Sequence, residues 1–431
     1  MTRTHLPRAP HGRPRPPRQT LHTEAPLHRV ATGITSTHFF CGVGGDTLGL
    51  AEAGITPVVA LNHSPVAVAT HTLNFPGCAH DAADINNYDM RRLPRTNILF
   101  GSPICKEASP ASGLAAPKKQ LTLDDAAADY APAASWERTR ATAYDLLRAA
   151  EVHRYDAVMW ENVVRFGTRW ELFDWWLGAW EVLGYVPQVV SVNAAHVGGD
   201  SGSTNARARQ DRNRLIGVMT RKGIKPPDLR VRPECVCAEC GPVRGIQKWR
   251  NPRGRRLGAY GEQYDYVCPN RRCGHLIVAP VTDAVEGIID WDLPLRRIAD
   301  GKPKRKEFTP YPDTTRARIQ GGLDLYRRVA EDGRRARGVI VHLGRDTAPR
   351  LTSSPLTTVA CKPHHALVIP GDSVDGSLMR MLGPRETAQA QRLPVTYQLH
   401  GTEAEKRTQI GNAVPVNLAH WAAKRLMASL V

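Results

Sequence analysis

Short apolar runs alternate with amphipathic stretches along the first half of the chain. Strand-like runs at 36–40, 57–61 and 97–100 are separated by helix-like stretches at 47–53 and 65–73. Because strands that alternate with helices build parallel sheets covered on both faces, the pattern predicts a doubly wound, mostly parallel α/β sheet. Further along, it predicts strands at 157–160, 186–193 and 215–219, and helices at 136–150 and 170–183.

The pattern changes near Arg221. From there to about residue 350 the chain is basic, rich in cysteine and poorly periodic, and a strand at 367–369 and a helix at 415–430 then restore the pattern. We therefore expect four segments. They are a basic tail over 1–30, the first part of an α/β domain over 31–220, a smaller irregular module over 221–350, and a part that completes the α/β domain over 351–431.

Composition adds an anionic partner to this picture. The formal net charge of +17 over 431 residues favours nucleic acid first and an anionic membrane surface second, against the alternative of a generally Arg-rich composition. The Arg-, His- and Pro-rich tail is expected to be disordered, and it either attaches weakly to DNA or is inert. No apolar run approaches the length of a membrane span and no signal peptide is evident, so we expect a cytoplasmic protein without a membrane partner.

Candidate chemistry lies at the ends of the predicted strands. A Gly-rich turn over 42–45 follows the first strand, and it lacks the Lys-Ser/Thr pair of a P-loop. Cys105 follows the third strand and is a candidate nucleophile, while Glu161 ends the next strand and is a candidate acid. Arg212 and Arg214 are spaced to point the same way on a strand and to bind a developing negative charge. Each residue alone is more often structural, but their combination favours an enzyme with covalent chemistry.

In this order the motifs resemble those of the DNA cytosine-5 methyltransferases, in particular divergent members from actinobacteria and their phages. The similarity covers roughly residues 35–220 and 350–430. The matching segments are Phe40-Cys41-Gly42-Val43-Gly44-Gly45, Ser102-Pro103-Ile104-Cys105, Glu161-Asn162-Val163, Gln210-Asp211-Arg212-Asn213-Arg214, Arg385-Glu386 and Gly411-Asn412-Ala413-Val414.

The resemblance implies a Rossmann-like domain, double-stranded DNA as substrate and a mechanism. Cys105 would add to carbon 6 of a flipped-out cytosine, because this carbon is inaccessible inside the base stack. Glu161 would contact N3 and the amino group, Arg214 would bind the O2 carbonyl, and Arg212 would support the pocket. Carbon 5 would then take a methyl group from S-adenosylmethionine. The segment 106–135 corresponds to the loop that closes over DNA, or is a plain insertion.

The cofactor-binding residues are expected on the same basis. Asp84 could instead be a helix N-cap. The residues implied to bind S-adenosylmethionine are Phe40, Gly42, Gly44, Gly45, Asn62, Asp84 and Asn412.

Three departures from the family pattern bear on cofactor affinity and on the group transferred, and one of them is the run Lys106-Glu107-Ala108-Ser109 after Cys105. Ile104 separates Pro103 from Cys105, where the family has a Pro-Cys dipeptide, and Asn62 stands where the family has an acid for the cofactor ribose. They leave open a related enzyme that places another group on carbon 5, and a catalytically weak DNA-binding homologue. The intact Cys105, Glu161 and Arg214 argue against the second alternative.

The cysteines of the irregular module have the spacing of a structural zinc site. A pair separated by two residues precedes a pair separated by four, about thirty residues further on, with Cys235 and His275 as spare ligands. The alternative is reduced thiols without metal. The predicted zinc ligands are Cys237, Cys240, Cys268 and Cys273.

Between these pairs lies a basic loop with one tryptophan, which suits contact with phosphates and a DNA groove. A solvated charged hairpin is the alternative. The resemblance makes this module the target-recognition domain of a monomer, and it leaves a cognate restriction enzyme open. The candidate DNA-binding residues are Lys248, Arg250, Arg253 and Arg255.

Overall fold

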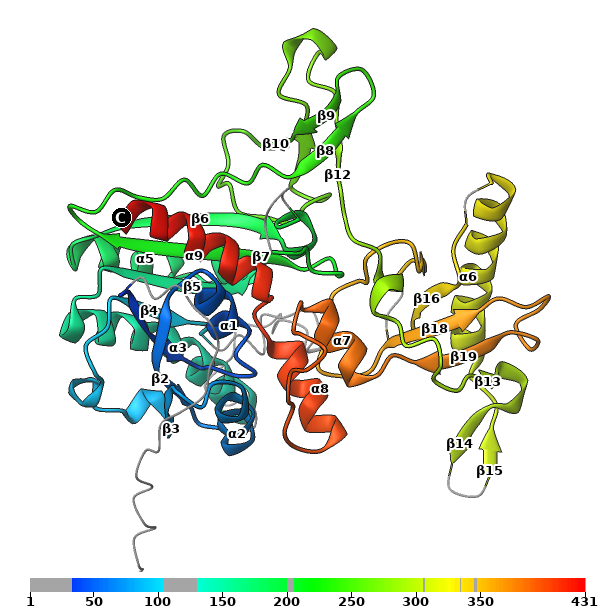
Figure 1. Ribbon diagram of the computed structural model, residues 1–431, viewed down its shortest axis with the longest axis horizontal. Helices are drawn as coiled ribbons and strands as arrows, with labels where there is room; N and C mark the ends of the chain where they lie inside the picture. Colours follow the sequence, from blue (N-terminus) through cyan, green and yellow to red (C-terminus); the bar gives the residue numbers. More distant parts are fainter. Residues whose placement is uncertain are drawn as a thin grey trace, which may run out of the picture.

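The protein is described here from a computed structural model, which describes residues 33–103, 130–199, 205–304, 307–333, 335–344 and 347–430. Figure 1 shows a large α/β domain, a small unit of short strands above it, and an antiparallel sheet with one long helix to the side. Helices α7 and α8 lie between the large domain and the antiparallel sheet.

A seven-stranded sheet forms the core of the large domain, with strand order β3-β2-β1-β4-β5-β7-β6. Strands β1 to β5 are mutually parallel, and β7 is antiparallel to both of its neighbours, β5 and β6. The mostly parallel sheet predicted from the sequence is therefore confirmed. Its strands are β1 Thr35–Phe39, β2 Thr56–Asn62, β3 Ala79–Ala82, β4 Ile98–Gly101, β5 Ala157–Val163, β6 Tyr185–Asn193 and β7 Asn213–Arg221.

Helices cover both faces of this sheet, and the central strand β4 shows why, because its residues Ile98, Leu99 and Phe100 are all apolar and buried. In β4, Ile98 and Phe100 pack in one core cluster with the first and last helices, whereas Leu99 packs in another with α3 and α5. Residues that alternate along a strand point to opposite faces, so a continuous apolar run requires a helix on each side. The helices are α1 Gly45–Glu52, α2 Pro65–Asn74, α3 Tyr130–His153, α4 Val164–Arg169, α5 Phe173–Val182 and α9 Val416–Leu430.

Three elements in the first half of the chain differ from the sequence expectation. Strand β3 was not predicted, since its sequence Ala-His-Asp-Ala has little apolar character. Helix α3 begins at Tyr130, inside the stretch expected to be irregular, and Pro132 is tolerated because it lies in the first turn, where backbone N–H groups have no helical partner. The expected helix at 170–183 is preceded by the separate short helix α4, and α5 begins only at Phe173.

The two ends of the described chain meet in the large domain. Helix α9 packs against α1, and the approach is so close that a Cβ at Gly49 would lie 2.5 Å from the backbone oxygen of Val416. The residues after 384 thus complete the domain that the first half of the chain begins. Two short helices lead to α9, namely α7 Pro384–Ala390 and α8 Glu403–Asn412.

The small unit above the sheet is built from short strands and follows β7 in the sequence (Figure 1). Its side chains form hydrogen bonds to the backbone of the large domain. For example, Gln247 Nε2 donates to the backbone oxygen of Ser191 at 2.9 Å. Strand β8 lies between β9 and β12, and β10 pairs with β11. The strands are β8 Glu234–Cys237, β9 Gly241–Arg244, β10 Ile246–Trp249, β11 Tyr264–Val267 and β12 Ala279–Pro280.

The antiparallel sheet crosses the boundary predicted at residue 350. Its order is β13-β19-β18-β16-β17, so strands from both sides of that boundary pair with one another. Helix α6 was not predicted, because its buried face mixes Ile319 and Leu323 with Thr315 and Gly322 among many arginines. The elements are β13 Arg296–Arg297, α6 Asp313–Glu331, β16 Val339–His342, β17 Arg350–Leu351, β18 His365–Ile369 and β19 Leu378–Met381, beside the hairpin β14 Lys302–Lys304 and β15 Glu307–Thr309.

Single-turn 3-10 helices connect several of these elements. Over the described ranges, no helix is both long and apolar enough to cross a membrane. The short helices are η1 Ile85–Asn87, η2 Met90–Arg92, η5 Ala194–His196, η6 Arg271–Cys273, η7 Val285–Ile288 and η8 Ile298–Asp300.

Candidate active site and cysteine cluster

A buried ion pair joins two of the predicted catalytic residues. Glu161 lies near the end of β5, and Arg214 lies at the start of the antiparallel neighbour β7, where it is in register with Val163. The Arg214 Nε atom is 2.6 Å from Glu161 Oε1, and the two side chains are only 11% and 8% exposed. Two charges withdrawn from water in this way require one another, so the pair presents a fixed carboxylate and guanidinium at one edge of the sheet.

Arg212 has a different environment from Arg214. Its guanidinium is buried and donates hydrogen bonds to the backbone oxygens of Val359, Gly411 and Ala413, at 2.9, 2.8 and 3.0 Å. Burial, and to a smaller extent the positive charge of Arg214, lower the pKa of Arg212 to about 9. Arg212 therefore ties the segment after residue 356 to the active-site strand, which fits the supporting role expected for it.

Asn162 holds the start of the predicted nucleophile loop beside the ion pair. Its side-chain amide donates to the backbone oxygen of Pro103 at 3.0 Å. Cys105, the predicted nucleophile, and Ile104 lie outside the described residues. The bond brings the segment that leads to Cys105 next to Glu161, although the two are far apart in the sequence.

Two residues of this site were not predicted. Asn162 is one, and Gln210 is the other: its side-chain oxygen accepts from the Val359 backbone N–H at 2.8 Å, and its amide donates to the Ala390 oxygen at 3.4 Å. The sequence could have indicated both residues, because Asn162 follows Glu161 and Gln210 precedes Arg212 within the same family motifs. A buried side-chain amide beside a charged residue is commonly kept for its hydrogen bonds.

The Gly-rich turn uses its glycines in two ways. Phe40, Gly42 and Gly44 have φ angles of 57°, 48° and 83°, a region that favours glycine. A Cβ at Gly42 would meet only the Phe40 backbone oxygen, at 3.6 Å, so the space beside it is open. A Cβ at Gly44 would clash with the Phe75 ring at 2.7 Å, and one at Gly45 with the Val414 oxygen at 2.1 Å. Gly42 therefore leaves room for a ligand, whereas Gly44 and Gly45 allow close packing.

The remaining cofactor candidates have local hydrogen bonds. The Asn62 side-chain oxygen accepts from the Ser64 backbone N–H at 2.9 Å. Asp84 caps η1, accepting from the backbone N–H of Asn86 at 3.2 Å, which is the alternative considered from the sequence. The Asn412 side-chain oxygen lies 3.3 Å from the Cys361 thiol. These contacts fix the side chains but leave their part in cofactor binding a prediction.

A series of hydrogen-bonded polar side chains links β1, α1, α2 and β3, the elements around the Gly-rich turn. His38 Nδ1 is 2.7 Å from Asp46 Oδ2, Thr47 Oγ1 is 2.9 Å from His71 Nε2, and His71 Nδ1 is 2.7 Å from His80 Nε2. Burial lowers the pKa of His71 well below 6.5, and the neighbouring His80 and His38 add to this effect. Burial also lowers the pKa of His80, so His71 and His80 are neutral around pH 7 and act as hydrogen-bonding supports.

Four cysteines of the small unit converge on one point. The Sγ atoms of the group lie within 4.8 Å of one another, and neither Cys235 nor His275 belongs to it. His275 Nδ1 instead lies 2.9 Å from the Cys268 backbone oxygen. Hydrogen bonds from the backbone of Cys240 and then Glu239 lower the pKa of the Cys237 thiol to about 7. The group consists of Cys237, Cys240, Cys268 and Cys273, as the spacing predicted.

The predicted DNA-binding residues divide into two kinds. Arg250 forms an ion pair with Asp265 at 3.1 Å. Arg255 pairs with Asp174 of the large domain and donates to the Gly167 oxygen at 2.8 Å, so it helps to dock the small unit. All four residues are exposed, but Lys248 and Arg253 form no ion pair with another residue that the structure describes. The geometry therefore favours Lys248 and Arg253 over the other two for contact with a partner.

Comparison with known proteins identifies the family. The chain matches the C-5 cytosine-specific DNA methylase family over residues 34–230 and 306–428, which is most of its length. It therefore belongs to this family. The first matched stretch contains the Gly-rich turn, Glu161 and Arg214, and the second contains the residues that Arg212 binds.

Solved structures with low sequence identity share the fold. A putative DNA modification methyltransferase encoded within an E. coli prophage is 16% identical, with a TM-score of 0.50 over 92% of this chain and 99% of that one. The DNMT2 of Spodoptera frugiperda, solved as a mutant, is 14% identical, with a TM-score of 0.53 over 91% and 99% of the two chains.

One curated relative matches over a short stretch. The type II methyltransferase M.HgiDI of Herpetosiphon aurantiacus is 44% identical over 61 residues, which make up 14% of this chain and 20% of that protein. The match thus spans about a fifth of the relative.

Proposed function

We propose that this protein is a DNA (cytosine-5-)-methyltransferase that methylates carbon 5 of a flipped-out cytosine in duplex DNA. The observation that carries the proposal is the buried pair of Glu161 and Arg214, at 2.6 Å, in a chain of the cytosine-specific family. A carboxyl group and a guanidinium held side by side match the N3 and O2 atoms of cytosine, which also lie side by side on its ring. Extrusion of the base is required because these atoms are paired inside the duplex.

In the proposed reaction, Cys105, Glu161 and Arg214 each have a defined task. The thiolate of Cys105 forms a bond to carbon 6, and the electron pair of the carbon 5–carbon 6 double bond moves into the ring toward N3 and O2. Glu161 contacts N3 and the amino group, holding a proton between its carboxylate and N3 as the thiolate attacks, and Arg214 binds O2, so both stabilise the charge that develops. S-adenosylmethionine, when bound, supplies the methyl group that carbon 5 takes. Loss of the carbon 5 proton to a base then lets the thiolate leave.

The same proposal places S-adenosylmethionine at the Gly-rich turn. The open space beside Gly42 admits a ligand next to the backbone, and Phe40 follows the end of β1 at the same point. Asn62 and Asp84 follow at the ends of neighbouring strands, where ligands bind in sheets of this type. Asn412 lies at the end of α8, which the closing segment brings toward β7.

We further propose that the four clustered cysteines bind one structural zinc ion. Zinc prefers four thiolates at the corners of a tetrahedron, and the convergence of the Sγ atoms supports such a site. A site with four cysteine ligands has no open position, so zinc would stabilise the small unit and take no part in the reaction.

The test of the proposed function is to express the chain in a host and sequence its plasmid by a method that detects 5-methylcytosine. We expect methylation at one short sequence, and none from a host that expresses Glu161→Gln. Matched expression of Glu181→Gln, which alters an exposed carboxylate of α5, is expected to leave methylation unchanged. Unmodified plasmid in the presence of soluble wild-type protein would contradict methyl transfer. A different adduct on carbon 5 would favour the related activity suggested by Asn62 and Ile104.

A further inference from the structure

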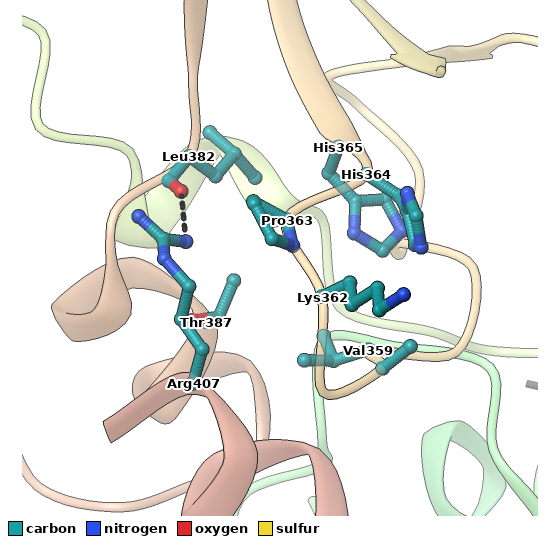
Figure 2. Close-up of a pocket in the computed structure, with 9 residues that line it drawn as sticks. Val359, Lys362, Pro363, His364, His365, Leu382, Thr387 and Arg407 are labelled. Atoms are coloured by element: carbon teal, nitrogen blue, oxygen red, sulfur yellow. Dashed lines mark hydrogen bonds between the residues drawn. The ribbon is translucent and has the colours of Figure 1, made fainter. Parts of the chain in front are cut away.

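A small recess beside the active site is lined by basic groups and by no acid. It lies between the loop over residues 357–364, the start of α7 and helix α8 (Figure 2). Its lining includes Lys362, His364 and Arg407, and the other side chains that line it are uncharged or, in His365, buried and neutral. Figure 2 shows Arg407 on the opposite side of Pro363 from Lys362 and His364.

The acids of the surrounding helices are occupied elsewhere. Glu386 of α7 pairs with Arg380 at 2.6 Å, and its own side chain is buried. On α8, Glu403 pairs with Lys406 at 3.3 Å, and Glu405 accepts from the Thr402 backbone N–H at 2.7 Å. The recess thus keeps its positive charge, since these carboxylates are not directed into it.

Both sides of the recess are held in place. The backbone oxygen of Leu382 accepts a hydrogen bond from Arg407 at 3.1 Å, which orients the guanidinium. Across the recess, Lys362 is exposed and has no ion pair among the residues described here. Its loop is fixed by the Leu343 backbone N–H, which donates to the His364 oxygen at 2.7 Å. An exposed lysine on a fixed loop is suited to bind an anion without a large loss of backbone entropy.

The same loop reaches the catalytic strand. The backbone oxygen of Val359 accepts a hydrogen bond from Arg212 at 2.9 Å, and the Thr358 hydroxyl donates to the backbone oxygen of Asp211 at 2.7 Å. Arg214, which pairs with Glu161, is two residues beyond Arg212. The basic recess and the proposed cytosine pocket are therefore connected by a few residues of one strand and one loop.

We propose that this recess binds a backbone phosphate of the DNA, next to the nucleotide that is extruded. Lys362 and Arg407 approach the phosphate from two sides, and His364 lines the same space. This inference rests on the proposed function, and it assigns a positioning role, since none of the three residues touches the reacting atoms. A phosphate contact here fixes the register of the DNA over the cytosine pocket and carries no sequence information.

The test compares the salt dependence of duplex DNA binding for the wild type and Lys362→Gln. Loss of one phosphate contact is expected to reduce the slope of log affinity against log salt by about 1. Lys362→Arg is expected to restore the slope. The matched control is Lys406→Gln on α8, which removes the same charge from a lysine that already has the partner Glu403. We expect the control to keep the wild-type slope.

The outcomes separate this inference from the proposed function. An unchanged slope for Lys362→Gln, or an equal decrease for Lys406→Gln, would overturn the phosphate site. Methyl transfer at saturating DNA is measured in the same wild-type preparation, and its absence would count against the proposed function. A reduced slope in Lys362→Gln with methyl transfer retained at saturating DNA supports both.

Discussion

Some residues of the active site stabilise the fold, and Arg212 is the clearest example because it holds the closing segment against the start of β7. Replacement by methionine is expected to lower the free energy of unfolding by about 3–5 kcal/mol, because three buried carbonyl oxygens lose their donor. Chemical denaturation of the variant measures this loss. Arg169→Met, at an exposed position, is the matched control and should cost less than about 0.5 kcal/mol. A loss as small as that of the control would show that Arg212 does not hold the closing segment.

Buried histidines make stability depend on pH. Burial lowers the pKa of His196 to about 4 and that of His365 to about 3, from an ordinary value of 6.5. Below pH 6.5 the unfolded chain binds protons that the folded chain does not, so stability is lost as the pH falls. For these two groups the loss between pH 7.5 and 5.5 is about 3 kcal/mol.

Urea unfolding at the two pH values measures this dependence. His365→Gln is neutral at both pH values and is expected to reduce the loss by about 1.4 kcal/mol, the contribution of one such group. His63→Gln, at an exposed site, is the control and should leave the loss unchanged. A stability that is constant or rises toward pH 5.5 would contradict the neutral state assigned to His196 and His365.

At the scale of elements, the cysteine cluster is expected to decide whether the small unit folds. We predict one zinc ion per chain, because four thiols that converge on one point match the tetrahedral ligand set of a structural zinc site. Cys268→Ser is expected to lose the metal and to make residues 234–280 sensitive to protease. Cys361→Ser, which alters a thiol outside the cluster, should keep both metal and resistance. Elemental analysis of protein prepared without chelator gives the direct answer, and a value near zero zinc per chain would refute the site.

The elements that the sequence predicted well share one property, which is a strong local pattern. Strands β2, β4 and β5 contain short apolar runs, and most of their buried positions follow from that pattern. Strand β3 and helix α6 were missed because their sequences are polar or mixed, and they are stabilised by neighbours that are distant in the sequence. Local patterns carry no information on such contacts.

The candidate site shows the same division. Glu161 and Arg214 could be assigned from their motifs, and the structure brings them together. The contacts of Arg212 and Asn162 could be known only from the fold, because each side chain donates to a backbone oxygen of a remote segment. For Arg255 the sequence suggested DNA, whereas the structure shows a contact with Asp174 of the large domain. A basic residue in a loop does not reveal its partner until the fold is known.

At the scale of the whole molecule, target choice is expected to reside in the unit after β7. The region proposed to choose the target comprises both the small unit and the antiparallel sheet. It therefore extends to β19, which ends at Met381, and does not end near residue 350. Exchange of residues 222–382 with the same region of a relative of different specificity should transfer that relative's target. Exchange of 222–350 alone should give unstable protein, because β13 and β16 would lose their matched partners β19 and β18. An active chimera of the longer kind that keeps the original target would contradict this assignment.

The central claim is that this chain forms a covalent bond to cytosine before it transfers a methyl group. The most direct measurement is incubation with S-adenosylmethionine and duplex DNA that contains 5-fluorocytosine at the target position. Fluorine cannot leave as a proton does, so the bond between Cys105 and carbon 6 should persist through denaturing electrophoresis, and mass spectrometry should place it on the peptide that contains Cys105. Cys105→Ser should give no such complex. Methylation of the ordinary duplex by the wild type, without any stable complex on the fluorinated one, would contradict the account.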